Sequence, residues 1–233
     1  MLYHRSVPSS HRGKFITFEG LDGSGKSTQM AKLAKALEAR GLEVVVTREP
    51  GGTPTGEKIR HVILDSGTTG LAPMAEMALM FASRAQHIRE VIAPALAEGK
   101  FVLCDRFTDS TEAYQGNGRK LGSEVVLELH RILCGDVQPD LTLLMDSDVA
   151  SSVARARRRN QKSSKDGHAR KDENRFEQES RAFFTRVRHG YLAIARREPE
   201  RVVVIDARGT PSQTHRRILD AVLRRFRMAA RVP

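Results

Sequence analysis

Residues 15–30 of the chain read FITFEGLDGSGKSTQM, and this stretch decides the fold. It begins as an apolar run, passes through a glycine-rich turn and continues as a helix-forming segment. The turn matches the pattern G-x-x-x-x-G-K-[ST], the phosphate-binding P-loop, through Gly20, Gly25, Lys26 and Ser27. A chance match is rare, on the order of one in 10⁴ per start position. A glycine-rich surface turn is therefore the weaker interpretation.

Each part of this loop has a physical task. The glycines admit backbone conformations that other residues avoid, so consecutive N–H groups can point into one concavity. The helix that opens at Lys26 turns the positive end of its dipole toward bound phosphate. Lys26 adds a mobile charge, and the Ser27 hydroxyl can bind the Mg²⁺ that accompanies a nucleoside triphosphate. The stretch therefore predicts a site for a nucleoside triphosphate.

The composition indicates one domain of ordinary size. Of 233 residues, 39% are apolar, enough for the core of an α/β domain. No apolar run approaches the roughly 18 residues of a membrane span, so we expect no membrane partner. Residues 1–13 lack the apolar core of a secretory signal, and their basic, acid-free composition favours a disordered tail over a transit-like segment. The two cysteines, Cys104 and Cys134, fit reduced thiols in a cytoplasmic protein.

The net charge of +11 suits either nucleic acid or a small polyphosphate ligand. Much of the excess lies in residues 155–175, which contain nine basic and three acidic residues and so carry a net charge of +6. No basic stripe is interleaved with aromatic residues, the pattern that stacks bases. The charge distribution therefore favours small polyphosphates, and we expect no nucleic-acid partner.

Apolar runs predict five strands, at residues 15–18, 42–47, 101–104, 141–146 and 201–206. Helical patterns separate them, at residues 29–39, 55–64, 73–87, 121–133, 149–159, 176–197 and 214–228. Strands that alternate with helices pair in parallel, so we expect one α/β sheet wrapped by helices. Ligands of such sheets bind beyond the carboxyl ends of the strands. Arg48, Glu49 and Asp105 follow their strands directly, which places them at the edge that carries the P-loop.

Three further features point to site residues. Arg84 is a charge within a mostly apolar helix, so it needs a partner or a ligand. An apolar strand that ends in Asp105 is typical of the metal-binding element that accompanies a P-loop. Residues 161–174 are polar and charged and should be mobile, either as a surface insertion or as an arginine-bearing lid over phosphates.

The ordered set of motifs, from about residue 14 to residue 227, resembles the bacterial type of thymidylate kinase. The motifs are FEGLDGSGKSTQ, TREPGGT followed by EKIR, the arginine of FASRAQH, DRFTDSTEAYQG, PDLTLLMD and RFEQES. The resemblance implies the P-loop NTPase fold with strand order 2-3-1-4-5, in a single nucleoside monophosphate kinase domain (residues 14–233) with a mobile lid at about 155–175. It also implies a homodimer that transfers the γ-phosphate of ATP to dTMP with Mg²⁺, giving dTDP and ADP for dTTP synthesis.

The resemblance implies roles for individual residues as well. The ATP phosphates would lie against Gly20, Leu21, Asp22, Gly23, Ser24, Gly25, Lys26, Ser27 and Thr28. Mg²⁺ would be held by Ser27 and Asp105. The dTMP site would be formed by Arg48, Glu49, Pro50, Arg60, Met80, Arg84, Arg106, Thr111, Tyr114 and Gln115. The residues implied in catalysis are Lys26, Asp22, Arg106 and the lid residues Arg155, Arg157 and Arg175.

Within the implied dTMP site, Arg48 and Arg106 would grip the phosphate, and Tyr114 would lie under the sugar. The thymine edge would be read by Arg84, Thr111 and Gln115.

The chain departs from the family pattern at a few positions. Met80 stands where family members usually carry a phenylalanine that stacks on the base, and sulfur over the ring is a plausible substitute. The lid is longer than usual, and Asn174 replaces the aspartate that normally precedes the lid arginine. Gly23 occupies the place of an arginine in the P-loop of eukaryote-like relatives, so the lid arginines would supply that charge.

Two rival functions remain open at this point. Another nucleotide or nucleoside kinase would share the P-loop and the strand ending in Asp-Arg, but it would prefer an acceptor other than dTMP. A basic ATPase that binds nucleic acid would bind duplex tightly, with a steep salt dependence. For a kinase we expect no strong general base, because the acceptor is already an anionic phosphate oxygen.

Overall fold

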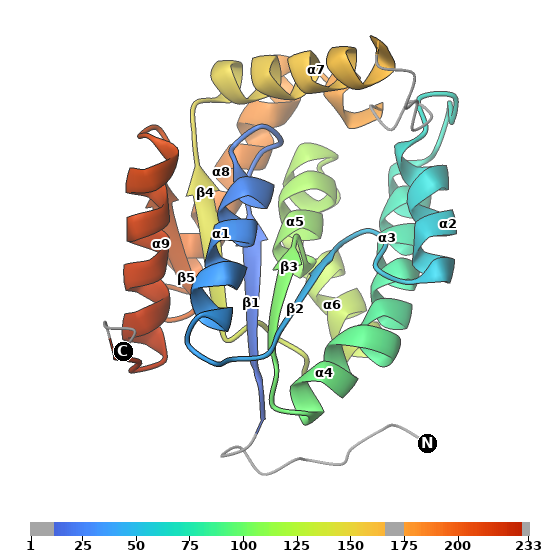
Figure 1. Cartoon of the computed structure of the whole chain (residues 1–233). Helices are drawn as coiled ribbons and strands as arrows, with labels where there is room; N and C mark the ends of the chain where they lie inside the picture. The colour runs from blue at the N-terminus through green and yellow to red at the C-terminus, as the bar shows by residue number, and fades with distance from the viewer. Residues whose placement is uncertain (1–11, 166–174, 230–233) are drawn as a thin grey trace.

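The computed structural model describes residues 12–165 and 175–229 (Figure 1), with only the backbone described for residues 159–165. Residues 1–11 of the expected tail and residues 166–174 of the expected lid lie outside the described ranges. Within the described ranges, no helix combines the length and the apolar character needed to cross a membrane.

Five parallel strands form one sheet at the centre of the structure (Figure 1). They are β1 (Lys14–Glu19), β2 (Val44–Arg48), β3 (Phe101–Asp105), β4 (Leu141–Asp146) and β5 (Val202–Asp206). Their order, β2-β3-β1-β4-β5, confirms the order that the resemblance implies. Phe18 and Arg48 both pair with Asp105. The polar residues that end these strands therefore share one edge of the sheet.

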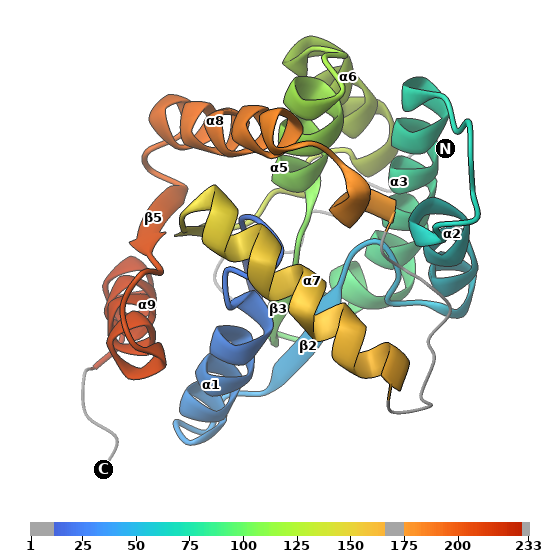
Figure 2. The ribbon, with the colours of Figure 1, turned by 90° about the horizontal axis from the view of Figure 1, so that it is seen from above.

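Side chains that alternate along the strands build a core on each face of the sheet. On one face, Ile16 and Phe18 pack beneath α1 (Lys26–Glu38) and α9 (Pro211–Arg225). The other face, which includes Phe15, is covered by α3 (Pro73–His87), α4 (Ala93–Ala97), α6 (Ser123–Cys134) and α8 (Arg181–Arg197). Seen from above, α7 (Val149–Lys165) crosses over the carboxyl ends of the strands (Figure 2).

Three further segments border the edge where the strands end. Helix α2 (Pro54–Leu64) follows β2 and packs along α3. Residues 108–118 form α5 (Thr108–Thr111) and the π-helical η2 (Glu112–Gly118). Helix α3 likewise continues through the π-helical η1 (Ile88–Ile92) into α4. Because π-helical turns often occur at functional sites, η2 marks a candidate wall of the site.

Two expected helices differ from those observed. Residues 176–197 do not form one helix: a 3₁₀ turn, η3 (Arg175–Gln178), precedes α8. The cause is local, because Ser180 Oγ accepts a hydrogen bond from the Phe183 N–H (3.2 Å) and caps a new helix. Helix α7 extends to Lys165, so it enters the stretch expected to be mobile.

Candidate active site

The P-loop between β1 and α1 has the backbone that its glycines require. Gly20, Gly23 and Gly25 have φ values of +124°, +78° and +97°. A Cβ atom at Gly20 would lie 2.5 Å from the Met145 carbonyl oxygen, and one at Gly23 would lie 2.3 Å from that of Ser152. A side chain at either position would therefore clash with backbone, and the loop rests directly against the end of β4 and the start of α7.

Lys26 lies beneath this loop with only 5% of its surface exposed. Its Nζ donates to the carbonyl oxygens of Gly20 and Leu21, both at 3.1 Å, and lies 3.8 Å from Asp22 and 4.0 Å from Asp105. Burial, followed by the nearby charge of Arg106, lowers the pKa of Lys26, whereas the neighbouring carboxylates act in the opposite direction. The ammonium is thus held against the backbone of the P-loop.

Ser27 and Asp105 form a pair of oxygen ligands beside Lys26. Ser27 Oγ donates to Asp105 Oδ2 at 3.2 Å. The other carboxylate oxygen, Oδ1, is buried; Lys26 Nζ lies 4.0 Å away, but no residue that the structure describes donates a hydrogen bond to it. Hydroxyl and carboxylate oxygens are the donors that Mg²⁺ prefers, and an unsatisfied buried oxygen needs a cation or a donor. The pair therefore fits a magnesium ion.

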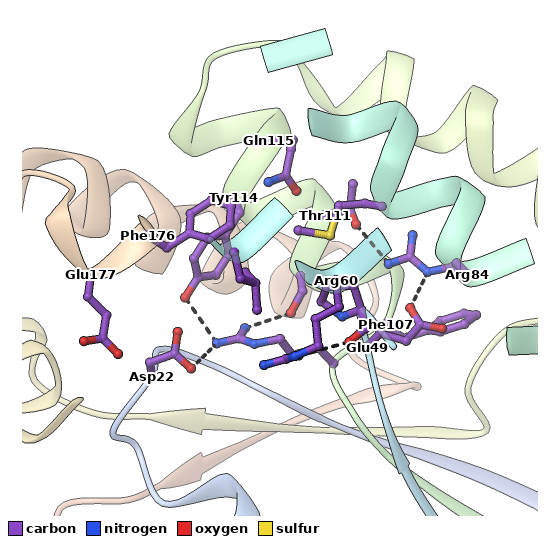
Figure 3. A pocket seen from close by; sticks show the side chains of 15 residues that line it. Asp22, Glu49, Arg60, Arg84, Phe107, Thr111, Tyr114, Gln115, Phe176 and Glu177 are labelled. Atoms are coloured by element: carbon purple, nitrogen blue, oxygen red, sulfur yellow. Dashed lines mark hydrogen bonds and ion pairs between the residues drawn. The ribbon is translucent and has the colours of Figure 1, made fainter. Parts of the chain in front are cut away.

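A pocket opens next to the P-loop, between β3, α2, α3, η2 and η3 (Figure 3). Its empty space is about 730 Å³, the open solvent at its mouth included. The substrate residues expected from the sequence that line it are Glu49, Pro50, Arg60, Met80, Arg84, Arg106, Thr111, Tyr114 and Gln115. Arg48 is not among the lining residues: its Nη2 donates to both carboxylate oxygens of Glu57, at 3.0 and 2.9 Å.

Arg106 lies at the boundary between pocket and P-loop (Figure 3). Its Nη1 donates to Ser110 Oγ (2.9 Å) and Tyr191 Oη (3.0 Å). Its Nη2 donates to Asp22 Oδ1 (2.9 Å) and Tyr114 Oη (3.3 Å). Burial alone would lower the pKa of Arg106, but Asp22 foremost among its neighbours raises that pKa well above the ordinary value. The guanidinium is therefore a fixed positive charge that touches both parts of the site.

Arg84 has the partner that its burial demands. Its Nε donates to Glu49 Oε2 (2.6 Å) and its Nη2 to Thr111 Oγ1 (3.0 Å), while Nη1 is buried without a hydrogen-bond partner in the described residues. The guanidinium lies over the ring of Phe81, 4.9 Å from its centroid. Phe81 is therefore part of the core, and Met80 is the neighbour that reaches the pocket wall.

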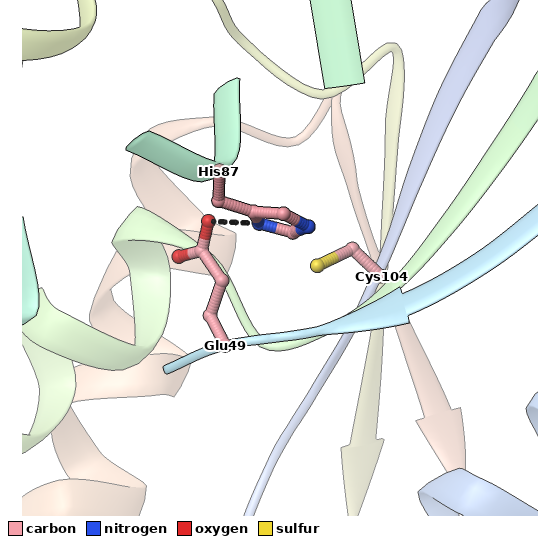
Figure 4. A group of neighbouring side chains, drawn as sticks. All are labelled: Glu49, His87 and Cys104. Carbon is pink, nitrogen blue, oxygen red and sulfur yellow. Dashed lines mark hydrogen bonds and ion pairs between the residues drawn. The ribbon is translucent and has the colours of Figure 1, made fainter. Parts of the chain in front are cut away.

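Glu49, His87 and Cys104 form a buried polar group behind the pocket (Figure 4). His87 Nδ1 lies 2.9 Å from Glu49 Oε1, and His87 Nε2 lies 2.6 Å from Thr47 Oγ1. Burial raises the pKa of the Cys104 thiol well above its usual range, which disfavours the thiolate that a metal would need. Since the imidazole nitrogens and the carboxylate oxygens already have protein partners, the group fits a metal poorly. It supports Glu49 in its contact with Arg84.

The three lid arginines expected at the phosphates have separate positions. Arg155 Nε donates to the Gly23 carbonyl oxygen at 2.7 Å, so this side chain lies against the P-loop. Arg157 donates to the carbonyl oxygen of Glu177, at 3.2 and 3.0 Å. Arg175 is turned toward the wall of the pocket, where its Nη2 donates to Glu76 Oε2 at 2.6 Å. A contact between Arg175 and phosphate stays a prediction.

A buried carboxyl group that sequence reasoning missed supports Arg106 from below. Glu19, the last residue of β1, is fully buried and accepts hydrogen bonds from the Phe107 N–H (2.7 Å), Ser110 Oγ (2.5 Å) and Tyr191 Oη (3.2 Å). The last two also accept from Arg106. Burial outweighs these donors and raises the pKa of Glu19 to about 8. The sequence feature that could have identified Glu19 is its position directly before Gly20, the first glycine of the P-loop.

Glu19 should make the stability of the chain depend on pH. Its pKa is about 8 in the folded chain against an ordinary 4.5, so the folded state binds the proton more tightly. The stabilisation that protonated Glu19 gives to the folded state is therefore fully present below pH 4.5 and is lost as the pH rises to about 8. In Glu19→Gln we expect the free energy of unfolding to decline less over this pH range, by an amount on the order of a few kcal/mol. Urea unfolding of both proteins from pH 5 to 9 measures it, and parallel curves would contradict it.

Comparison with known proteins assigns the family. The family model described as thymidylate kinase matches residues 18–218. A thymidylate kinase of Trichlorobacter lovleyi is 51% identical over 212 residues, covering 91% of this chain and 98% of that protein. One of Geobacter sulfurreducens is 47% identical over 213 residues, with coverages of 91% and 98%.

The solved structures agree with this assignment. A crystal structure of thymidylate kinase from Ehrlichia chaffeensis has a TM-score of 0.70 to this chain at 34% identity, covering 91% of this chain and 99% of that one. The matched range contains the P-loop, Asp105, Arg106 and all of the residues that line the pocket. The chain therefore belongs to the thymidylate kinase family.

Proposed function

We propose that the P-loop holds the phosphates of ATP and that the adjacent pocket holds dTMP. As a member of its family, the chain is a kinase that transfers the γ-phosphate of ATP to dTMP, giving ADP and dTDP. The position of Arg106 carries the assignment of the two sites, because this residue lines the pocket and also donates to Asp22 of the P-loop. One guanidinium thus lies where the two phosphate groups would meet.

The chemistry at this meeting point is alignment and charge neutralisation. Two polyanions must approach each other, and the fixed charges of Lys26 and Arg106 offset their repulsion. Arg155, which lies against the P-loop at Gly23, is the lid arginine best placed to add to them. Because the acceptor is an anionic phosphate oxygen, the reaction needs no strong general base.

The far end of the pocket would recognise the base. The buried Nη1 of Arg84 is a donor available to a thymine carbonyl oxygen. Gln115 lines the same pocket as Arg84 (Figure 3). Met80 supplies a sulfur for contact with the ring, and Tyr114, whose hydroxyl accepts from Arg106, would lie under the sugar. The nucleotide would then span from Arg84 to Arg106.

Catalysis at this site would use a magnesium ion bound by Ser27 and Asp105 together with the ATP phosphates. The ion supplies charge neutralisation across the transferred phosphoryl group. We expect Asp105→Asn to raise the Mg²⁺ concentration for the half-maximal rate by about tenfold or more, since the amide loses the charge that binds the ion. Titration of Mg²⁺ at fixed ATP measures this, and an unchanged half-maximal concentration would refute the assignment.

The test of the function is ADP release measured by a coupled assay, with and without dTMP. We expect ADP release to depend on dTMP and to be much slower with dUMP, dGMP, AMP or thymidine as acceptor. ATP consumption that is unaffected by dTMP would overturn the proposal.

We also propose that the kinase acts as a homodimer. Helix α3 lies between α2 and α6 on one flank of the structure (Figures 1 and 2). The three helices also carry apolar side chains that are exposed to solvent. These side chains are Val62, Met74, Val125, Leu127, Ile132 and Leu133. Their grouping on adjacent helices supports an interface with a second copy of the chain. Light scattering should give twice the mass of the chain, and a monomeric mass at micromolar concentration would refute the dimer.

We propose one kinase domain over residues 14–233, with a lid at about 155–175 that approaches the P-loop through Arg155. Both cysteines are free and buried, which is typical of a reducing compartment and supports a cytoplasmic location. Protease protection of residues 155–175 by ATP and dTMP together tests the lid.

A further inference from the structure

We propose that Glu76 is a positioning residue that fixes the orientation of the Gln115 amide, so that the pocket offers an acceptor, and not a donor, to the nucleotide base. This inference rests on the assignment of the pocket to dTMP. It concerns a residue of α3 that does not line the pocket itself.

The contacts of Glu76 leave one orientation for the amide. Its carboxylate is fully buried and accepts from Gln115 Nε2 at 2.8 Å. Arg119 donates to the same carboxylate through Nε (3.2 Å) and Nη2 (3.1 Å), and Arg175 through Nη2 (2.6 Å). A carboxylate paired with two guanidiniums can only accept hydrogen bonds. The nitrogen of the Gln115 amide must therefore face Glu76, and the oxygen must face away.

The two arginines hold the carboxylate in place. Arg175 Nε donates to the carbonyl oxygen of Ile63 at 2.6 Å, which ties it to the end of α2. Both guanidiniums lie over the ring of Phe176, with centroid distances of 5.6 Å for Arg119 and 4.7 Å for Arg175. Rotation of the Glu76 carboxylate would break contacts to three side chains, those of Gln115, Arg119 and Arg175. The orientation imposed on Gln115 is therefore rigid.

The fixed orientation of Gln115 determines which hydrogen-bonding groups the pocket offers to a base. Gln115 lines the pocket, and its Oε1 accepts no hydrogen bond within residues 12–165 and 175–229. Arg84 contributes the opposite function, because its buried Nη1 is a donor without a partner in the same ranges. Thymine presents an N3–H donor beside its O4 acceptor, whereas cytosine presents an N3 acceptor beside its amino donor. The pair of Gln115 and Arg84 complements thymine and opposes cytosine.

The proposal is tested with Glu76→Gln and two monophosphates, dTMP and 5-methyl-dCMP, which differ only in the edge that the pair would read. A glutamine at position 76 both donates and accepts, so it satisfies either orientation of Gln115. We expect the ratio of kcat/KM for dTMP to that for 5-methyl-dCMP to fall at least about tenfold, since a mispaired buried group costs that much or more. The change should lie mainly in KM for the monophosphate, with KM for ATP unchanged.

The matched control is Glu112→Gln. Glu112 is also buried and accepts two hydrogen bonds from one arginine, Arg197, at 2.6 and 2.8 Å, but it does not line the pocket. We expect this variant to lose stability and to keep the substrate ratio. An unchanged ratio in Glu76→Gln would reduce Glu76 to a structural residue and overturn the proposal.

Two more variants make every result decisive. If Glu76→Gln does not fold, the double variant Glu76→Gln/Arg119→Met also removes one of the two guanidiniums left beside the neutral amide, at a partly exposed position, and it must lower the same ratio; failure to do so overturns the proposal. Gln115→Leu separates the proposal from the function on which it rests. If that variant keeps the wild-type KM for dTMP, the assignment of the pocket to the base is wrong, whatever Glu76 does.

Discussion

Replacing Arg106 by alanine is expected to lower kcat for dTMP phosphorylation by about 10³–10⁵, the range found for arginines at a transferring phosphoryl group. The guanidinium is held by Ser110, Tyr191, Asp22 and Tyr114 at 2.9–3.3 Å, so no water or neighbouring side chain can reproduce its charge at that point. The measurement is ADP release at saturating ATP and dTMP, with circular dichroism to show that the variant is folded.

Two controls sharpen this result. Arg106→Lys keeps the charge but loses the planar fork that meets four partners, so we expect an intermediate kcat. Arg197 is also paired with a carboxylate, that of Glu112, but it does not line the pocket. Arg197→Ala should therefore keep kcat within about twofold of the wild-type value. A near-normal kcat in Arg106→Ala would refute the role of this residue between the two phosphates.

Replacing Lys26 by alanine should have an effect of similar size, with a loss in kcat of about 10³ or more. Lys26, at the start of α1, is 95% buried, and its ammonium is held by two P-loop carbonyl oxygens, so the charge is already placed where charge develops during transfer. Because this stabilisation is greatest in the transition state, we expect kcat to fall far more than the affinity for ATP. Single-turnover kinetics with bound ATP and dTMP measure the step directly.

The control for this variant lies on the same helix. Lys35 is exposed in the last turn of α1, at the far end of the helix from the loop, and Lys35→Ala removes the same charge from the chain without touching the site. Its kcat should match that of the unmodified chain. If Lys26→Ala and Lys35→Ala were equally active, the charge of Lys26 would not contribute to transfer.

The site was only partly predictable from sequence. Most of the residues expected around dTMP line one pocket, because they follow strands whose carboxyl ends share one edge or lie on helices beside that edge. Arg48 ends a strand at this edge too, but Glu57, one turn into α2, pairs with it and holds it outside the lining. No pattern in the sequence distinguishes a loop arginine that meets a ligand from one that meets a neighbouring carboxylate.

The sequence by itself determined the P-loop, the five parallel strands and the edge where ligands bind. Glycine spacing, apolar runs and strand–helix alternation are local properties, and each one restricts the backbone directly. Only the tertiary structure decided that Glu19 lies under Arg106 and that Glu76 faces Gln115. The partners of Glu76 lie 39 residues away at Gln115 and 99 at Arg175, and such contacts arise from packing between elements, which leaves no periodic signal in the chain.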